Sequence, residues 1–334
     1  MDELSGRQGV SRWLPYVQAY AKAYEQGVRL SGLSGHAALS TGCAGVSDHG
    51  VTTRNCALTQ NCKRLQGTPD ARNGVSCDRL LRVGKSPVVV LCSPHPDDEM
   101  LTGALPLRLR HEQGARVVNL AITLGSDSSR QEARWQELHA ACAVVGFECR
   151  QLSMPVEFDL KAGEDCPDWD IVVEALAVVF SELVPDIVLL PHEEDHHPTH
   201  IATHRLVSAA LAIFTLGANS VLAVETEFWR PMAAPNLLIG LDVSGVAWLV
   251  AALSCHRGEI ERNPYHLTQP PRMMDTVRRG AELVEGDGLE GRPGFLFGEL
   301  YRVSRWRQGG IHSLDLAHGR IGPDQSLEAI IASK

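Results

Sequence analysis

Residues 88–99 have the sequence VVVLCSPHPDDE, in which a short apolar run leads directly into a group of acidic side chains. A run of β-branched and apolar residues this short suits a strand that is buried on both faces, as in a parallel sheet. A helix is predicted next, over residues 101–113, and Gly114 ends it. The stretch therefore predicts a strand, a polar loop and a helix, which together begin an α/β unit.

The same alternation continues along the chain. Strands are predicted over residues 116–123, 149–154, 185–190 and 221–228, and helices over residues 129–145, 169–183 and 199–214. This order predicts an open α/β fold, with a mostly parallel sheet, helices on both faces and right-handed crossovers. Such sheets bind ligands beyond the carboxyl ends of their strands. We therefore expect a site in the loops that follow residues 92 and 190.

Composition and charge exclude several classes of function. The 334 residues include 31 Lys and Arg against 40 Asp and Glu, a net charge of −9, which argues against a nucleic-acid partner. No apolar run is long enough to predict a membrane-spanning helix. The start, Met1-Asp2-Glu3-Leu4, lacks the basic-then-apolar order of a secretory signal. With nine cysteines and no C-x-x-C pair, reduced thiols and a cytoplasmic location are expected.

The first 84 residues differ from the rest of the chain. Residues 13–30 predict an amphipathic helix, whereas residues 31–78 are rich in Gly, Ser, Thr, Asn and Cys and show no lasting apolar period. We therefore expect an N-terminal extension over residues 1–84, made of one helix and a loop-rich insertion. The α/β domain is expected over residues 85–320, followed by a C-terminal tail over residues 321–334.

The loop after the first strand has the composition of a metal site. His95, Asp97, Asp98 and Glu99 place one imidazole and three carboxylates within five residues. Carboxylates this close raise each other's pKa, and a bound divalent cation removes that conflict. A catalytic zinc takes three such protein ligands, and residues 192–204, which hold five of the fourteen histidines, are the expected source of the third. The alternative is a helix N-terminus with two acidic caps.

Two motifs resemble those of a known family. Residues 95–99 (HPDDE), followed by Gly103, resemble the opening motif of the PIG-L/LmbE-like zinc-dependent N-acetylglucosaminyl deacetylases. Residues 197–200 (HPTH) resemble the family's second motif, HPDH, with Thr199 in place of the usual Asp. The resemblance spans residues 85–306. It implies a Rossmann-like fold and a hydrolase that removes the N-acetyl group from an N-acetylglucosamine-type sugar conjugate.

The resemblance also assigns roles to residues of this sequence. It implies His95, Asp98 and His200 as ligands of Zn²⁺, with another divalent metal as the alternative. Asp97 matches the general base that acts on a metal-activated water. His197 matches the histidine that stabilises the tetrahedral intermediate or protonates the leaving amine.

Three further residues are expected to contact the substrate. Arg134 matches a substrate-binding arginine in an R-x-x-E motif, and Glu299 belongs to a late strand motif, GELY. His256 sits where the family often has a histidine near the cleft. Because Thr199 lacks the carboxylate of the usual Asp, Asp195 is the candidate to take over its supporting role.

Other functions stay open at this point. The same chemistry could act on another amide, such as a thiol conjugate, or the protein could be a catalytically silent sugar-binding protein. A nucleotide-binding oxidoreductase is disfavoured because no G-x-G-x-x-G follows the first strand. A metallophosphatase would normally need ligands for two metals. The expected partner is a small-molecule amino-sugar conjugate, and a homo-oligomer is neither indicated nor excluded.

Overall fold

The structure is a computed structural model that describes residues 3–30, 86–154, 156, 158–217, 219–284, 293–314, 316 and 319–328. The predicted loop-rich insertion over residues 31–78 lies outside these described ranges. None of the helices that the structure describes is both long and apolar enough to cross a membrane.

Within the described ranges, the strands form one nine-stranded sheet in the order β3-β2-β1-β4-β5-β7-β6-β9, with β8 paired to β7. The strands are β1 (Val88–Ser93), β2 (Arg116–Ala121), β3 (Glu148–Gln151), β4 (Ile187–Pro191), β5 (Ser220–Thr226), β6 (Leu237–Leu241), β7 (Phe297–Arg307), β8 (Gly310–Ser313) and β9 (Arg320–Ile321). Strands β3, β2, β1, β4 and β5 run parallel to one another, which confirms the predicted mostly parallel sheet. Strand β7 runs antiparallel to both β5 and β6.

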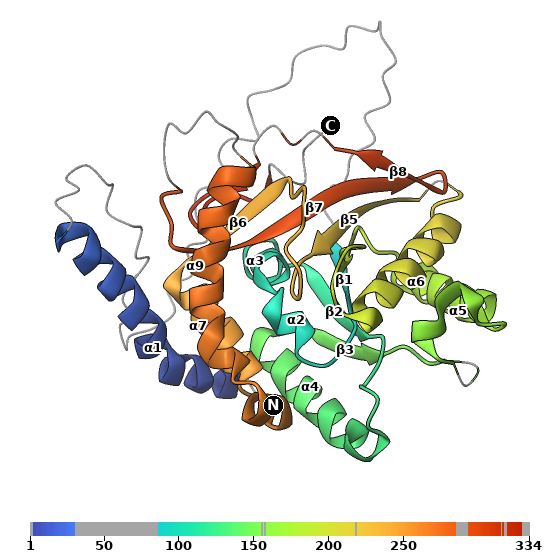
Figure 1. The fold of residues 1–334 in the computed structure, drawn as a ribbon, viewed down its shortest axis with the longest axis horizontal. Helices are drawn as coiled ribbons and strands as arrows, with labels where there is room; N and C mark the ends of the chain where they lie inside the picture. Colours follow the sequence, from blue (N-terminus) through green and yellow to red (C-terminus); the bar gives the residue numbers. More distant parts are fainter. Residues whose placement is uncertain are drawn as a thin grey trace, which may run out of the picture.

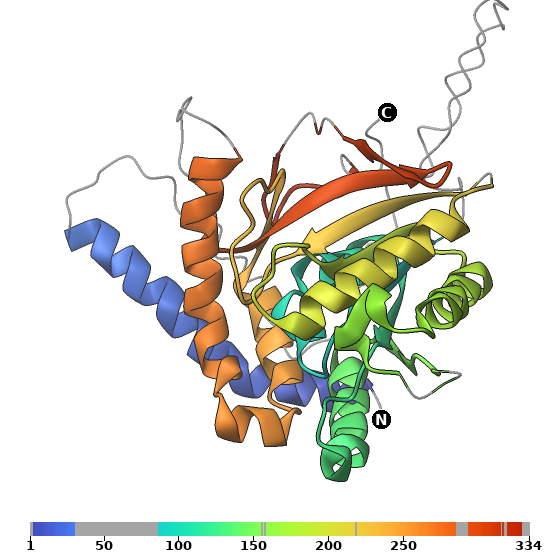
Figure 2. The same ribbon diagram turned by 45° about the vertical axis from the view of Figure 1, so that its right-hand side comes forward.

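Helices cover both faces of this sheet, as predicted (Figures 1 and 2). They are α1 (Glu3–Leu30), α2 (Asp98–Leu101), α3 (Ala104–Gln113), α4 (Gln131–Val145), α5 (Trp169–Leu183), α6 (Pro198–Phe214), α7 (Val243–Leu253), α8 (Arg257–Arg262) and α9 (Tyr265–Leu283), with short 3₁₀ turns η1 (Ser128–Arg130) and η2 (Leu160–Asp165). Because side chains alternate along a strand, Val89 and Leu91 of β1 join the core beneath α1, α3, α4 and α7. Val90 and Cys92 join the core beneath α5 and α6.

The helix predicted over residues 101–113 is two helices, α2 and α3. The helix is interrupted at Thr102 and Gly103. A Cβ atom on Gly103 would lie 2.8 Å from Leu249 Cδ2 of α7. Only glycine allows this close approach. The first turn of α3 is capped from β7, where Glu299 Oε2 accepts the backbone N–H of Ala104 at 2.9 Å.

Both chain ends of the described structure pack on the α/β domain. Helix α1 begins at Glu3, earlier than the predicted residue 13, and buries Val17 and Ala21 in the core that it shares with α7. At the other end, Leu327 is fully buried, and Arg108 donates to the carbonyl oxygen of Gly322 at 2.9 Å. The described parts of the predicted extension and tail therefore share a core with the sheet.

The strand order places the two motif loops side by side. The chain passes from β1 to β2 and β3, and then returns to β4 on the other side of β1, where Val89 pairs with Ile187 and Leu91 with Leu189. Parallel neighbours end at the same edge of the sheet, and the point where the strand order reverses leaves a crevice there. The loops after β1 and β4 flank this crevice.

Candidate metal and catalytic site

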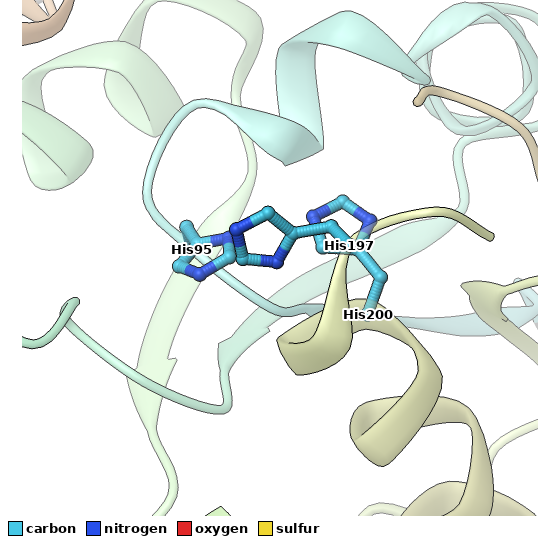
Figure 3. Close-up of side chains that lie close together, drawn as sticks. All are labelled: His95, His197 and His200. Carbon is cyan, nitrogen blue, oxygen red and sulfur yellow. The ribbon is translucent and has the colours of Figure 1, made fainter. Parts of the chain in front are cut away.

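Three histidines meet where the loops after β1 and β4 come together (Figure 3). His95 lies in the loop after β1, whereas His197 is the N-cap of α6 and His200 lies in its first turn. One ring nitrogen from each histidine can be chosen so that all three lie within 4.8 Å of one another. The cluster is assembled from segments that are far apart in the sequence, because β1 and β4 are neighbours in the sheet.

Asp98 lies between two of these histidines. Its Oδ2 atom is 3.2 Å from Nδ1 of His95 and 3.2 Å from Nε2 of His200. Ligands that share one cation at about 2.1 Å lie roughly 3.0–3.4 Å apart, so this spacing fits a common divalent ion. Although burial opposes ionisation, His200 and His95 hold the pKa of Asp98 well below its usual range. Burial also lowers the pKa of His200, but the Asp98 carboxylate outweighs it and raises that pKa to about 10.

Imidazole nitrogens and a carboxylate oxygen are the usual ligands of a divalent cation, and one buried nitrogen here has no hydrogen-bond partner. Nε2 of His200 is buried and makes no hydrogen bond in the described structure, although it faces the Asp98 carboxylate. Asp98 Oδ2 lies 3.2 Å from a nitrogen of His95 and of His200, and the nitrogens of His95, His197 and His200 lie within 4.8 Å of one another. The structure therefore brings His95, Asp98, His197 and His200 together as candidate ligands.

Asp195, the residue expected to stand in for the missing carboxylate at position 199, lies behind the His200 ring, at the nitrogen that faces away from Asp98. Asp195 Oδ2 lies 3.4 Å from Nδ1 of His200, and its Oδ1 accepts the backbone N–H of His197 at 2.9 Å. A carboxylate on the far nitrogen of a ligating histidine fixes the ring orientation and its tautomer. Asp195 is buried, and the His200 ring lies between it and Asp98, with Nδ1 facing Asp195 and Nε2 facing Asp98.

The backbone of α6 sets the tautomer of His197. The N–H of Thr199 donates to Nδ1 of His197 at 3.3 Å, so the neutral ring carries its proton on Nε2. Burial, followed by the charges on His95 and His200, lowers the pKa of His197 to about 4. A neutral His197 is therefore a hydrogen-bond donor through Nε2.

Asp97 stands in a strained backbone conformation beside the cluster. Its φ is 111°, a left-handed value that is rare for a residue other than glycine and that is typical of functional sites. Its N–H donates to Glu99 Oε2 at 2.9 Å, and Glu99 Oε1 lies 2.7 Å from Nε2 of His256. Burial first, and then the carboxylates of Asp98 and Glu99, raise the pKa of Asp97 well above its usual range.

A cavity of about 510 Å³ opens next to these groups. His95, Asp97, Asp98 and His197 line it. Further lining comes from apolar and aromatic side chains: Leu152, Met154, Phe158, Phe228, Trp229 and Tyr265. This volume lies in the range of ordinary small-molecule sites, so the cavity can hold a substrate of one or two rings.

The three residues expected at the substrate lie in different places. Arg134 lines the cavity, and its guanidinium donates to the carbonyl oxygen of Pro96 at 3.1 Å and lies 3.4 Å from Oε1 of Glu259. His256 is fully buried against Glu99 and is not among the described residues that line the cavity. Glu299 is not among them either, because its carboxylate is directed to the N-terminus of α3.

Glu259 and Tyr265 are polar lining residues that the sequence did not mark as candidates. Glu259 of α8 is buried and forms ion pairs with Arg130, Arg134 and Arg262, and Tyr265 begins α9 at the cavity wall. Both belong to segments without a chemical motif, so nothing in their local sequence marks them.

Comparisons with known proteins place similar chains in one family. The family described as "GlcNAc-PI de-N-acetylase" (PIG-L) matches residues 90–211. The "1D-myo-inositol 2-acetamido-2-deoxy-alpha-D-glucopyranoside deacetylase" of Nakamurella multipartita is 31% identical over 278 residues, which are 72% of this chain and 93% of that protein. The protein of the same name from Mycobacterium leprae (strain Br4923) is 25% identical over 201 residues, 52% of this chain, and the match spans 62% of that relative's length.

Among solved structures, the conserved protein TT1542 from Thermus thermophilus shares the fold. The TM-score is 0.50 at 22% sequence identity, and the match covers 65% of this chain and 93% of that chain.

Proposed function

Because this chain belongs to the GlcNAc-PI de-N-acetylase (PIG-L) family, we propose that it is a metal-dependent N-deacetylase acting on an N-acetylglucosamine-type sugar conjugate. One observation carries the proposal. Asp98 Oδ2 lies 3.2 Å from both His95 and His200, the spacing of ligands that share one cation, beside a cavity that Asp97 also lines. The named relatives act on a 2-acetamido-2-deoxyglucopyranoside, which supplies the substrate class.

The cation that we propose for this site is Zn²⁺, with another divalent metal as the alternative. His95, Asp98 and His200 would hold it through two imidazole nitrogens and one carboxylate oxygen, which suits zinc. When bound, such an ion lowers the pKa of a water molecule and polarises a carbonyl group.

The chain's own residues would then move the protons. Asp97 accepts a proton from the water that attacks the acetyl carbon, and the Nε2–H of His197 donates to the carbonyl oxygen as it becomes negative. The carbon–nitrogen bond then breaks, and Asp97 returns the proton to the departing amine, so that acetate and the free amino sugar result. Arg134 supports this arrangement by holding the carbonyl of Pro96, next to Asp97.

Acetate release and metal content test the proposal together. The metal-loaded protein is incubated with a panel of N-acetylglucosamine conjugates, including 1D-myo-inositol 2-acetamido-2-deoxy-α-D-glucopyranoside, and the released acetate is measured. We expect Asp97→Asn to lower kcat by about 10²- to 10⁴-fold while it binds as much metal as the wild type. Glu182→Gln is the matched control, because this carboxylate forms an exposed ion pair with Arg150 outside the cavity lining.

Each other outcome points to a different function. If the protein binds metal but hydrolyses a different amide, such as a thiol conjugate, that amide and not the sugar conjugate is the substrate. Metal and sugar binding without any acetate would indicate a sugar-binding protein. A chain that binds no divalent metal would refute the role of His95, Asp98 and His200.

We also propose that the protein works in the cytoplasm on a small-molecule substrate. The odd number of cysteines, nine, and the free thiols of the described Cys92, Cys142, Cys149, Cys166 and Cys255 support this location, because thiols stay reduced there. Cell fractionation with detection of the native chain tests it, and recovery in an exported fraction would contradict it.

A further inference from the structure

Trp229 is a large exposed aromatic side chain at the wall of the cavity. It keeps 47% of its surface exposed, and in the described part of the chain the other large exposed aromatic is Tyr24 of α1, at 37%. An indole that stays half exposed forgoes much of the hydrophobic stabilisation that burial would give. Because Trp229 lies in the cavity wall, a ligand bound in the cavity can cover its exposed surface.

The indole of Trp229 is one ring away from the candidate metal ligands. It stacks on the His197 ring, with centroids 5.8 Å apart and planes inclined by 27°. The His197 ring lies in turn 4.9 Å from the ring of His95. The edge of Trp229 also contacts Phe228, at a centroid distance of 4.9 Å. A group bonded directly to the reacting amide nitrogen would therefore lie within reach of the indole.

Buried polar side chains hold the loop that carries Trp229 on both sides. Glu227 is buried, accepts the backbone N–H of Met232 at 2.7 Å and forms an ion pair with an arginine of α9. His192 is also buried, and its Nε2 donates to the carbonyl oxygen of Arg230 at 2.8 Å. Burying such groups is costly unless they are hydrogen-bonded, so these contacts fix the loop in one conformation. The exposed indole thus stands on a preformed support.

We propose that Trp229 is a stacking platform for the ring that bears the acetamide, and that it makes the site select ring-borne acetamides over acyclic ones. This inference rests on the proposed function. A pyranose ring has a face of C–H groups that packs on the electron-rich face of an indole, while its hydroxyl groups stay in water. An acyclic acetamide offers no such face. Leu152, Met154 and Phe158 line the same cavity and add apolar surface for the C–H groups of such a ring.

The test compares two substrate classes in the metal-loaded protein. Methyl 2-acetamido-2-deoxyglucopyranoside represents the ring-borne acetamides and N-acetylethanolamine the acyclic ones. Stacking contributions of the usual size predict that Trp229→Ala lowers kcat/KM for the pyranoside about 3- to 10-fold, mainly through KM, and leaves the acyclic substrate within about 2-fold. Trp229→Phe should recover most of the loss, and Tyr24→Ala should change neither substrate.

A binding measurement keeps the platform testable without turnover. In the Asp97→Asn background, calorimetric titration with the pyranoside should give a Kd that Trp229→Ala weakens by the same factor. Equal losses for both substrates would mean that Trp229 only supports His197, and would overturn the selection. Pyranoside binding that is undetectable, or that Trp229→Ala leaves unchanged, would overturn the platform. Tight, Trp229-dependent binding in this background, together with no acetate release by the wild type, would instead refute the proposed hydrolysis and keep the platform.

Discussion

Glu299 should make the stability of this protein depend on pH in a direction opposite to that of most carboxylates. Its side chain is buried, and it accepts hydrogen bonds from the N–H of Ala104 and, at 2.6 Å, from the hydroxyl of Tyr301. Burial raises its pKa from the ordinary 4.5 to about 7, even though Arg272 and these donors act against the rise.

The sign and size of the effect follow from linkage. Because the folded state holds the proton more tightly than the unfolded state, the stabilisation is fully present below pH 4.5 and is lost as the pH rises through about 7. At 1.36 kcal/mol for each unit of pKa, the difference corresponds to about 3 kcal/mol of unfolding free energy. Glu299→Gln keeps the shape and an acceptor for Ala104, but it cannot titrate.

Urea denaturation at several pH values between about 4 and 8 measures this contribution. The unfolding free energy of the wild type should fall by about 3 kcal/mol relative to that of Glu299→Gln across this range. Asp127→Asn is the control, because Ser129 lowers the pKa of this exposed carboxyl and so places its titration below the range. A difference between wild type and Glu299→Gln that does not change with pH would refute the reasoning.

Three further substitutions test the supports of the site and the fold. Asp195→Asn should weaken divalent-metal affinity about 10- to 100-fold in a chelator competition, because it removes the carboxylate behind His200; unchanged affinity would contradict this. His256→Leu removes the partner of Glu99 and should lower kcat while metal content stays constant. His256→Gln should recover part of the lost kcat, because it can still donate to Glu99, and equal activity in both variants would argue against a positioning role. Arg108→Leu removes the guanidinium that donates to three backbone carbonyls and should cost about 3–5 kcal/mol in unfolding free energy by calorimetry, whereas a loss below about 1 kcal/mol would contradict the role of this buried guanidinium.

The sequence by itself determined the first five strands, most of the helices between them and the local parts of the site. Alternation of buried strands with amphipathic helices predicted the α/β sheet, because side-chain period reports the environment of each element directly. His95 and Asp98 lie within one turn of the chain, and His197 and His200 within one turn of α6, so each pair is positioned by local geometry. The candidate metal ligands that the PIG-L resemblance named could therefore be identified from the sequence.

Only the tertiary structure decided which of these parts meet. The contact between Asp98 and His200 depends on β1 and β4 being neighbours, and strand order is set by packing over the whole sheet, not by local sequence. The same is true of residues whose partners are distant in the chain. His256 turns to Glu99 and Glu299 to the start of α3, so neither reaches the cavity, whereas Trp229 does. Burial and cavity lining are properties of the packed chain, and one residue's neighbours in sequence do not specify them.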